Sequence, residues 1–141
     1  MNPETIEKAL ALFARIGYAI LATADARGVP HVSTARKVAF KPDHTLHVSE
    51  WFCPGTLENV GSNGKIAVVI WDRGADRGYQ LLGEVERIDD LAVLDGYHPA
   101  SEREPVPQVQ RRLVVRVDQT LAFSHAPHTD REERVEPVGG G

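Results

Sequence analysis

Residues 65–88 read KIAVVIWDRGADRGYQLLGEVERI, and this stretch decides the fold class. Its first part, 65–71, is almost wholly apolar, as expected for a central strand that is covered on both faces. Asp72-Arg73-Gly74 is a turn signal, after which a second long strand is predicted over 78–88. So short a connection favours antiparallel pairing, because parallel strands need a crossover of about a dozen residues or more.

The chain begins with an amphipathic helix, predicted over 3–16. Asn2 is a helix-capping residue, Pro3 suits the first turn, and Gly17 provides the stop. The apolar side chains repeat at helical spacing and form one face: Ile6, Ala9, Leu10, Phe13 and Ile16. A dense apolar run follows the glycine and predicts a first strand over 18–23.

Four further elements and one long excursion complete the pattern. A strand over 29–40 carries polar residues on both sides, which is typical of a strand between a core and a site and also of an exposed edge strand. A strand over 45–49 and a short helix over 56–62 follow it, and the last strand is predicted over 111–118. Residues 89–108 are acidic and hold three prolines, so we interpret them as a surface excursion that could cover a site.

A helix followed by six strands, with no alternation of strands and helices, predicts an antiparallel barrel or a sheet curled on itself. The fold class is therefore mainly β (α+β). The 141 residues suffice for one domain. We expect this domain over 1–123, followed by a polar C-terminal tail over 124–141.

Charge and composition argue against nucleic-acid binding, a membrane span and an intramolecular disulfide. The chain holds 16 basic and 20 acidic residues, for a net charge of -4, and no basic cluster that would predict nucleic-acid binding. It lacks the apolar run of about 18 residues that a membrane span needs, and residues 1–15 do not resemble a secretory signal, so a cytoplasmic location is expected. Cys53 is the single cysteine and excludes an intramolecular disulfide. The expected partner is a small molecule or another protein.

Two histidine pairs spaced by three are the candidate metal ligands. They are His44 with His47 and His125 with His128. No cysteine or carboxylate cluster at ligand spacing supports either pair, so we interpret all four as exposed polar residues and predict no metal site. The chain also lacks a Gly-x-Ser-x-Gly sequence, so hydrolysis by a nucleophilic serine is disfavoured.

The start of the short helix is a candidate phosphate site. Gly55-Thr56 opens this helix, so backbone N–H groups and the Thr56 hydroxyl could bind a phosphate, with Asn59 one turn along. The alternative is that Thr56 only caps the helix and Asn59 is a surface residue, because threonine caps are common. No Walker or Gly-x-Gly-x-x-Gly sequence is present.

An ordered set of segments resembles the FMN-binding split-barrel family of pyridoxamine 5′-phosphate oxidase. The segments are LATAD (21–25), GVPHV (28–32), TLHVS (45–49), TLENV (56–60), KIAVVIWD (65–72) and RGYQLLGEVE (77–86). The likeness is greatest to the small single-domain members. It implies a six-stranded Greek-key split barrel and a homodimer with two FMN molecules at the subunit interface.

The resemblance also implies flavin contacts from two strands. Ser33, Thr34 and Ala35 would lie along the isoalloxazine ring and the ribityl chain. Ser49 and Glu50 would lie beside the ring or the ribityl hydroxyls.

The phosphate would be held by Gly55, Thr56 and Asn59 at the start of the short helix. Arg36 and Lys37 are candidates for positive charge near the pyrimidine end of the ring. The strand that lines the same cleft, in this subunit or its partner, would contribute Tyr79, Gln80 and Leu81.

Two departures from the family pattern shape the functional hypothesis. Cys53-Pro54-Gly55 stands where pyridoxamine phosphate oxidases carry a Ser-Arg-Lys cluster for the FMN phosphate. The sequence also lacks a match to the family's C-terminal substrate-binding segment of basic and aromatic residues. Oxidation of pyridoxamine phosphate is therefore not expected. The leading hypothesis is an FMN-dependent oxidoreductase acting on an unidentified small molecule or redox partner. The alternatives are a non-enzymatic flavin-binding or electron-carrier protein, and a relative that uses deazaflavin or haem.

Overall fold

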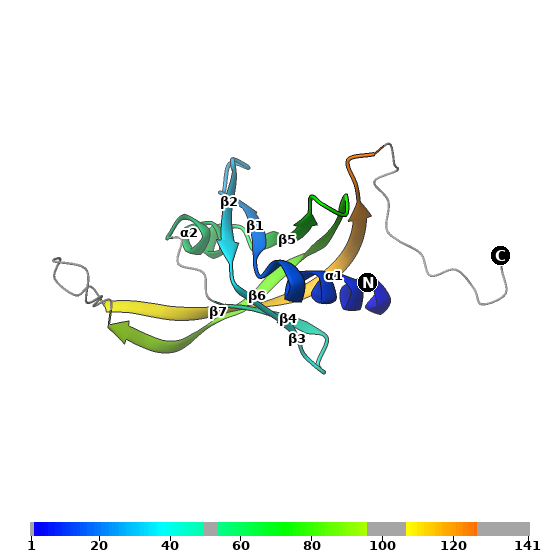
Figure 1. The fold of residues 1–141 in the computed structure, drawn as a ribbon. Coiled ribbons are helices and arrows are strands. Elements are labelled where there is room, and N and C mark those ends of the chain that lie inside the picture. The colour runs from blue at the N-terminus through cyan, green and yellow to red at the C-terminus, as the bar shows by residue number, and fades with distance from the viewer. Residues whose placement is uncertain (1, 50–53, 96–106, 127–141) are drawn as a thin grey trace, which may run out of the picture.

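The computed structural model describes residues 2–49, 54–95 and 107–126, which hold two helices and seven strands (Figure 1). The elements are α1 (Pro3–Ile16), β1 (Ala19–Ala24), β2 (Pro30–Ala35), β3 (Lys37–Phe40), β4 (Thr45–Ser49), α2 (Pro54–Ser62), β5 (Lys65–Asp72), β6 (Arg77–Asp95) and β7 (Pro107–Phe123). Every strand pair is antiparallel. The predicted class, mainly β with helices, is therefore confirmed.

Helix α1 has the ends that its sequence predicts. The Asn2 side chain accepts hydrogen bonds from the backbone N–H groups of Glu4 and Thr5, at 3.1 and 3.5 Å. Gly17 adopts φ 88° and donates its N–H to the carbonyl of Phe13 at 2.7 Å, a left-handed conformation that glycine adopts without a steric penalty. Capping residues at both ends thus fix the length of the helix.

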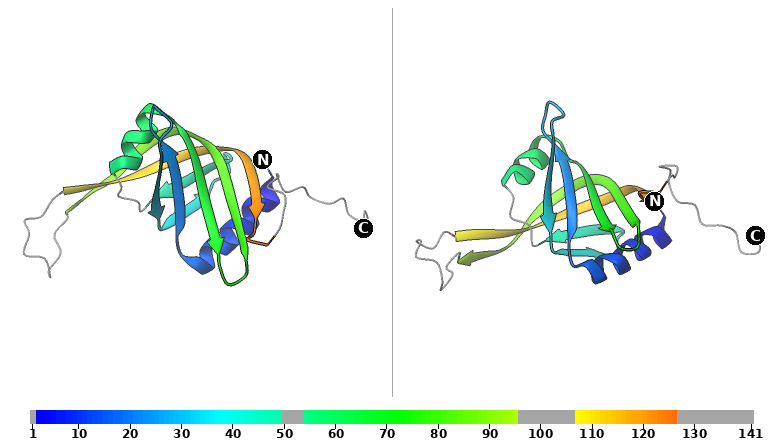
Figure 2. Two further views of the ribbon diagram at one scale, coloured as in Figure 1. Left: turned by 90° about the horizontal axis from the view of Figure 1, so that it is seen from above. Right: turned by 45° about the horizontal axis from the view of Figure 1, so that its top comes forward.

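The sheet has seven strands rather than the predicted six, because the strand expected over 29–40 is broken at Arg36. On one side of this residue β2 pairs with β1, and on the other side β3 pairs with β4. The strand order is β2-β1-β5-β6-β7-β4-β3. The two outermost strands are therefore consecutive in the chain, and the sheet curls until its two edges meet at this corner (Figure 2). This is a split-barrel arrangement.

Strands β6 and β7 form a long arm, which corrects the prediction for residues 89–108. Their pairing continues to Asp95 and Pro107, so residues 89–95 and 107–108 of the expected surface excursion belong to a two-stranded ribbon that extends beyond the barrel (Figure 1). Register shifts at Val85/Arg87 and Asp90/Ala92 interrupt the alternation of side chains, which is why the pattern was not recognisable as a strand. Residues 96–106 lie outside the described part of the chain.

The hydrophobic core fills the barrel, with α1 and α2 near opposite ends of strand β1. Fully buried core side chains include Leu21, Leu46, Val68, Leu81 and Leu113. Helix α1 adds Ile6, Ala9 and Leu12 to this core, and Figure 2 shows it lying across one end of the barrel. Helix α2 packs against β1 and β2, which places its side chains near the β1–β2 turn.

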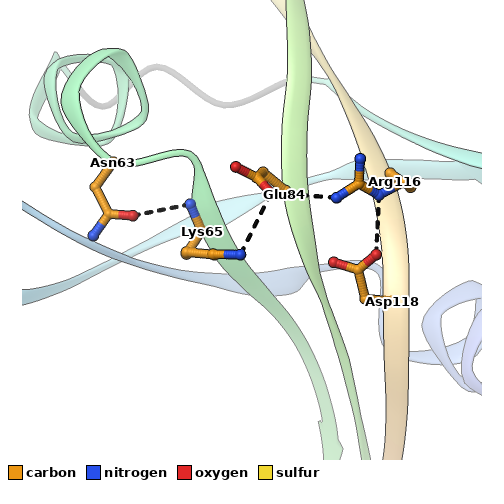
Figure 3. A network of polar contacts seen from close by, with 5 residues as sticks. All are labelled: Asn63, Lys65, Glu84, Arg116 and Asp118. Carbon is orange, nitrogen blue, oxygen red and sulfur yellow. Dashed lines mark hydrogen bonds and ion pairs between the residues drawn. The ribbon is translucent and has the colours of Figure 1, made fainter.

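A chain of polar contacts crosses the outer face of β5, β6 and β7 (Figure 3). Glu84 Oε2 lies 3.4 Å from Lys65 Nζ and 3.2 Å from Arg116 Nη2, and Arg116 Nε lies 3.0 Å from Asp118. The Asn63 side chain accepts from the Lys65 backbone N–H at 3.1 Å. Because these side chains are exposed and screened by solvent, the network contributes little to stability.

Candidate functional site

The hairpin of β1 and β2 becomes more polar toward its turn. Its inward-facing register pairs are first Ala19 with Ala35, then Leu21 with Ser33, and finally Thr23 with His31. The first two pairs adjoin the core, since Ala19, Ala35 and Leu21 are all fully buried. Helix α2 covers the polar end, so three polar side chains of the hairpin face this helix.

Two hydrogen bonds join α2 to the hairpin. The Ser33 and Thr56 hydroxyl oxygens lie 2.6 Å apart, and either can donate. Asn59 Nδ2 donates to the Thr23 hydroxyl at 3.1 Å. Thr56 is fully buried and Asn59 is 8% exposed, so the Asn59–Thr23 bond is buried and the Ser33–Thr56 bond is partly buried. Only one hydroxyl hydrogen is used between Ser33 and Thr56, so the pair retains one O–H that can donate elsewhere.

Gly55 lets the ring of His31 lie against the first turn of α2. A Cβ atom at this position would lie 3.1 Å from His31 Nε2 and 3.3 Å from its Cε1, closer than ordinary van der Waals contact. No acidic residue lies in this first turn. The backbone N–H groups of the turn, the helix dipole, a hydroxyl pair and an imidazole therefore meet at one place, which suits an anionic group.

The structure brings Ser33, Gly55, Thr56 and Asn59 together, as described above, and places the other predicted residues of β2 to β4 elsewhere. Thr34 and Arg36 are exposed, whereas Ala35 belongs to the core. Ser49 is 6% exposed and is the register partner of Lys37 on β3. Glu50 lies outside the described residues.

The predicted residues of β6 lie away from α2, near the end of the barrel that α1 covers. Tyr79 is 2% exposed, and its hydroxyl oxygen accepts from Arg77 Nη1 at 3.2 Å. Together they line a depression of about 230 Å³ beside α1. Leu81 is fully buried in the core, and Gln80 lies on the opposite face of the strand, between Val69 and Leu121.

His47 on β4 is a residue whose environment the sequence did not reveal. We predicted an exposed side chain, but the ring is partly buried and both ring nitrogens are buried. Burial lowers the pKa of His47, and the positive charges of Arg112 and Lys41 lower it further, against the opposing effect of Asp43. His47 is therefore held neutral below the pH at which an ordinary histidine takes up a proton.

This environment predicts a pH-dependent stability that His47 controls. The unfolded chain binds a proton at the ordinary histidine pKa of about 6.5, before the folded chain does. The free energy of unfolding should thus fall as the pH decreases from about 7 through the lowered pKa of His47. We expect His47→Gln to lose less stability than the wild type between pH 7.5 and about 5.5 in urea titrations. His125→Gln, which changes an exposed histidine, should follow the wild type. Equal pH dependence in all three proteins would contradict this account.

Among the described residues, no three His, Cys, Asp or Glu side chains gather closely enough to hold a metal ion. None of the helices in residues 2–49, 54–95 and 107–126 is long and apolar enough to cross a membrane.

Solved structures similar to this chain share its fold. HupZ from Group A Streptococcus is 26% identical, with a TM-score of 0.60, and the match covers 84% of this chain and 94% of HupZ. A pyridoxamine 5′-phosphate oxidase-related, FMN-binding protein from Nostoc punctiforme is 15% identical, with a TM-score of 0.62 and coverage of 88% and 86%. An F420 reductase is 23% identical, with a TM-score of 0.55 and coverage of 78% and 93%.

Sequence comparison gives the family. No curated protein matches the chain significantly. A family model described as pyridoxamine 5′-phosphate oxidase matches residues 5–125, which include α1 from its third residue, α2 and all seven strands of the described residues. The chain belongs to the pyridoxamine 5′-phosphate oxidase family, a family of flavin-binding oxidoreductases.

Proposed function

We propose that the chain is an FMN-binding oxidoreductase that acts on a small molecule or a redox partner. The observation that carries the proposal is the arrangement at α2. Its first turn lacks acidic residues, its Thr56 is joined to Ser33 at 2.6 Å, and Gly55 lies under the His31 ring. Membership of the family adds support, because the FMN-binding protein from Nostoc punctiforme has the same fold.

The residues present fit the phosphate of FMN. The backbone N–H groups of Gly55 and Thr56 would donate to the phosphate, as at other helix N-termini. Because Thr56 is fully buried in the single chain, its hydroxyl fixes the first turn by pairing with Ser33. Arg36 is exposed at the corner of the sheet, and under this proposal its charge would act on the cofactor.

We further propose that two copies of the chain form a homodimer with the flavin at the interface. Sedimentation should then report a dimer at working concentration. A monomer would contradict a flavin site that two subunits share. When bound, FMN supplies the redox chemistry. The chain's own residues would hold the phosphate, and Arg36 and Lys37 would place positive charge near the ring.

FMN binding can be tested with one variant of the phosphate site and one control. We expect added FMN to lose fluorescence on binding, with saturation at micromolar protein. Thr56→Ala should raise the Kd by about 5- to 30-fold, since losing one hydrogen bond that supports a charged group costs about 1–2 kcal/mol. Ser62→Ala is the control, because Ser62 is the last residue of α2 and its hydroxyl donates to the backbone carbonyl of Asn59 at 3.2 Å, away from the first turn.

The wild-type titration tests whether FMN binds, and the Kd values of the two variants test where its phosphate lies. If the wild type shows no saturable quenching, the proposed function is wrong. If FMN binds but Thr56→Ala and Ser62→Ala have the wild-type Kd, the phosphate lies elsewhere on the molecule. Saturation by a deazaflavin or by haem in place of FMN would instead favour the alternative cofactors.

A further inference from the structure

His47 on β4 and Arg112 on β7 are neighbours on the outer face of the barrel. His47 is the register partner of Val114. Arg112 lies two residues before Val114, so its side chain projects from the same face of β7. Residues in this diagonal relation are about 7–8 Å apart and within reach of long side chains. The Arg112 charge accordingly acts on the imidazole and lowers its pKa.

Three nitrogen atoms of this pair form a set of buried hydrogen-bonding groups. His47 Nδ1, His47 Nε2 and Arg112 Nε are buried and have no hydrogen-bond partner among the described residues. Buried polar atoms nearly always have a partner, because leaving one unpaired forfeits its hydration. Arg112 keeps 31% of its side chain exposed, so this set adjoins the surface. While His47 is neutral, this set holds two N–H donors and one acceptor nitrogen on two adjacent strands, and a proton on the ring turns the acceptor into a third donor.

The carboxylates around His47 are already engaged. Asp43 accepts hydrogen bonds from the N–H and the hydroxyl of Thr45, at 3.2 and 2.6 Å. Asp89 accepts from Arg87 Nε at 3.0 Å and from Arg112 Nη2 at 3.2 Å. Neither carboxylate accepts a hydrogen bond from His47, although the charge of Asp43 acts on the ring.

The charges that face His47 are positive in sum. Three cations, Lys41, Arg87 and Arg112, stand against two carboxylates, Asp43 and Asp89. Further along the strands, Arg116 pairs with both Glu84 and Asp118, and Glu86 also acts on Arg116, so that region adds no positive charge. A proton on His47 would increase this excess, so a negative charge is the group that the site can accept.

We propose that His47 and Arg112 form an oxyanion-binding site in which binding is coupled to protonation of His47. The ligand is a tetrahedral or carboxylate oxyanion, either free or as part of a metabolite. Arg112 Nε–H and one N–H group of the imidazolium donate to its oxygens. Above the pKa of His47, the ring takes one proton from solvent as the anion binds, so each bound anion brings one proton with it.

This inference does not rest on the proposed function. The oxyanion site lies on β4 and β7, whereas the proposed phosphate site lies at α2 and β2. FMN affinity and oxyanion affinity are measured separately, so one can fail while the other holds.

Sulfate is the probe of choice, because its charge stays constant between pH 5 and pH 8. The NMR signals of the His47 ring give its titration midpoint in sodium sulfate and in sodium chloride of equal ionic strength, which controls for screening. We expect a higher midpoint in sulfate, with the exposed His125 unchanged. In calorimetry, the sulfate Kd should rise by up to about tenfold for each pH unit above the His47 midpoint. Equal His47 midpoints in the two salts would overturn the proposal.

A matched pair of arginine variants tests the donor set. Arg112→Gln should abolish the difference between the His47 titration midpoints in sulfate and in chloride. Arg15→Gln should retain it, since Arg15 is an exposed arginine paired with Asp72 at 3.1 Å. If Arg112→Gln fails to fold, the wild-type comparison of the two salts decides alone. An unchanged sulfate effect in folded Arg112→Gln would contradict the role of Arg112.

Discussion

Replacing Gly83 with alanine should destabilise the protein by about 3 kcal/mol or more, the range of severe overpacking. A Cβ atom at Gly83 would clash with the Arg116 carbonyl oxygen and would lie 2.9 Å from its carbonyl carbon. These are backbone atoms, so no side-chain rotation relieves the clash. The register of β6 against β7 shifts between Leu82 and Gly83, and the two strands can only accept the methyl group by moving apart.

Gly61 provides the control for this prediction. A Cβ atom there meets nothing within 4 Å, and the residue lies in α2. Gly61→Ala should therefore be neutral or stabilise by up to about 1 kcal/mol, because alanine restricts the unfolded chain more than glycine does. Urea unfolding of both variants measures the difference. A similar stability for the two alanine variants would contradict the close approach of β6 and β7.

Shortening Leu81 to alanine should cost about 2–5 kcal/mol of stability, the usual range for a buried leucine. Leu81 is fully buried and lies between Val68 on β5 and Thr120 on β7. The truncation would leave a cavity in the barrel, since neighbouring strands cannot collapse into it freely.

Leu91 on the same strand is the matched control, because its side chain is 41% exposed. Leu91→Ala should change the free energy of unfolding by no more than about 0.5 kcal/mol. The Kd for FMN of the folded Leu81→Ala protein tests the other role of Leu81, the flavin contact that the family resemblance implies. A loss of stability with an unchanged Kd would assign Leu81 to the core alone. A Leu81→Ala variant as stable as Leu91→Ala would contradict the placement of Leu81 in the core.

The elements with local signals were predictable from the sequence. Helix α1 has a capping asparagine at one end and a glycine at the other, and both act as expected. Strand β4 covers Thr45–Ser49, and β5 extends the predicted 65–71 by Asp72 alone. The break at Arg36 was not predictable, because 29–40 has polar residues on both sides and alternation cannot locate a corner in such a strand.

The candidate site was likewise predictable only where its residues carry a local signal. Gly55, Thr56 and Asn59 stand at the start of a helix, where spacing alone indicates what they can bind. The pairing of Thr56 with Ser33 depends on the hairpin that brings β2 beneath α2. His47 alternates with the core residues Leu46 and Val48, so its position predicted exposure. Its burial involves β7, which the sequence does not identify as its neighbour.

The absorption spectrum of the purified protein, followed by release of its chromophore on denaturation, tests the central claim most directly. The proposed function predicts the spectrum of an oxidised flavin, and FMN in the released fraction. If the protein is purified without a chromophore, added FMN should restore that spectrum. The spectrum of a deazaflavin or of haem, or a protein that takes up no FMN, would contradict the claim.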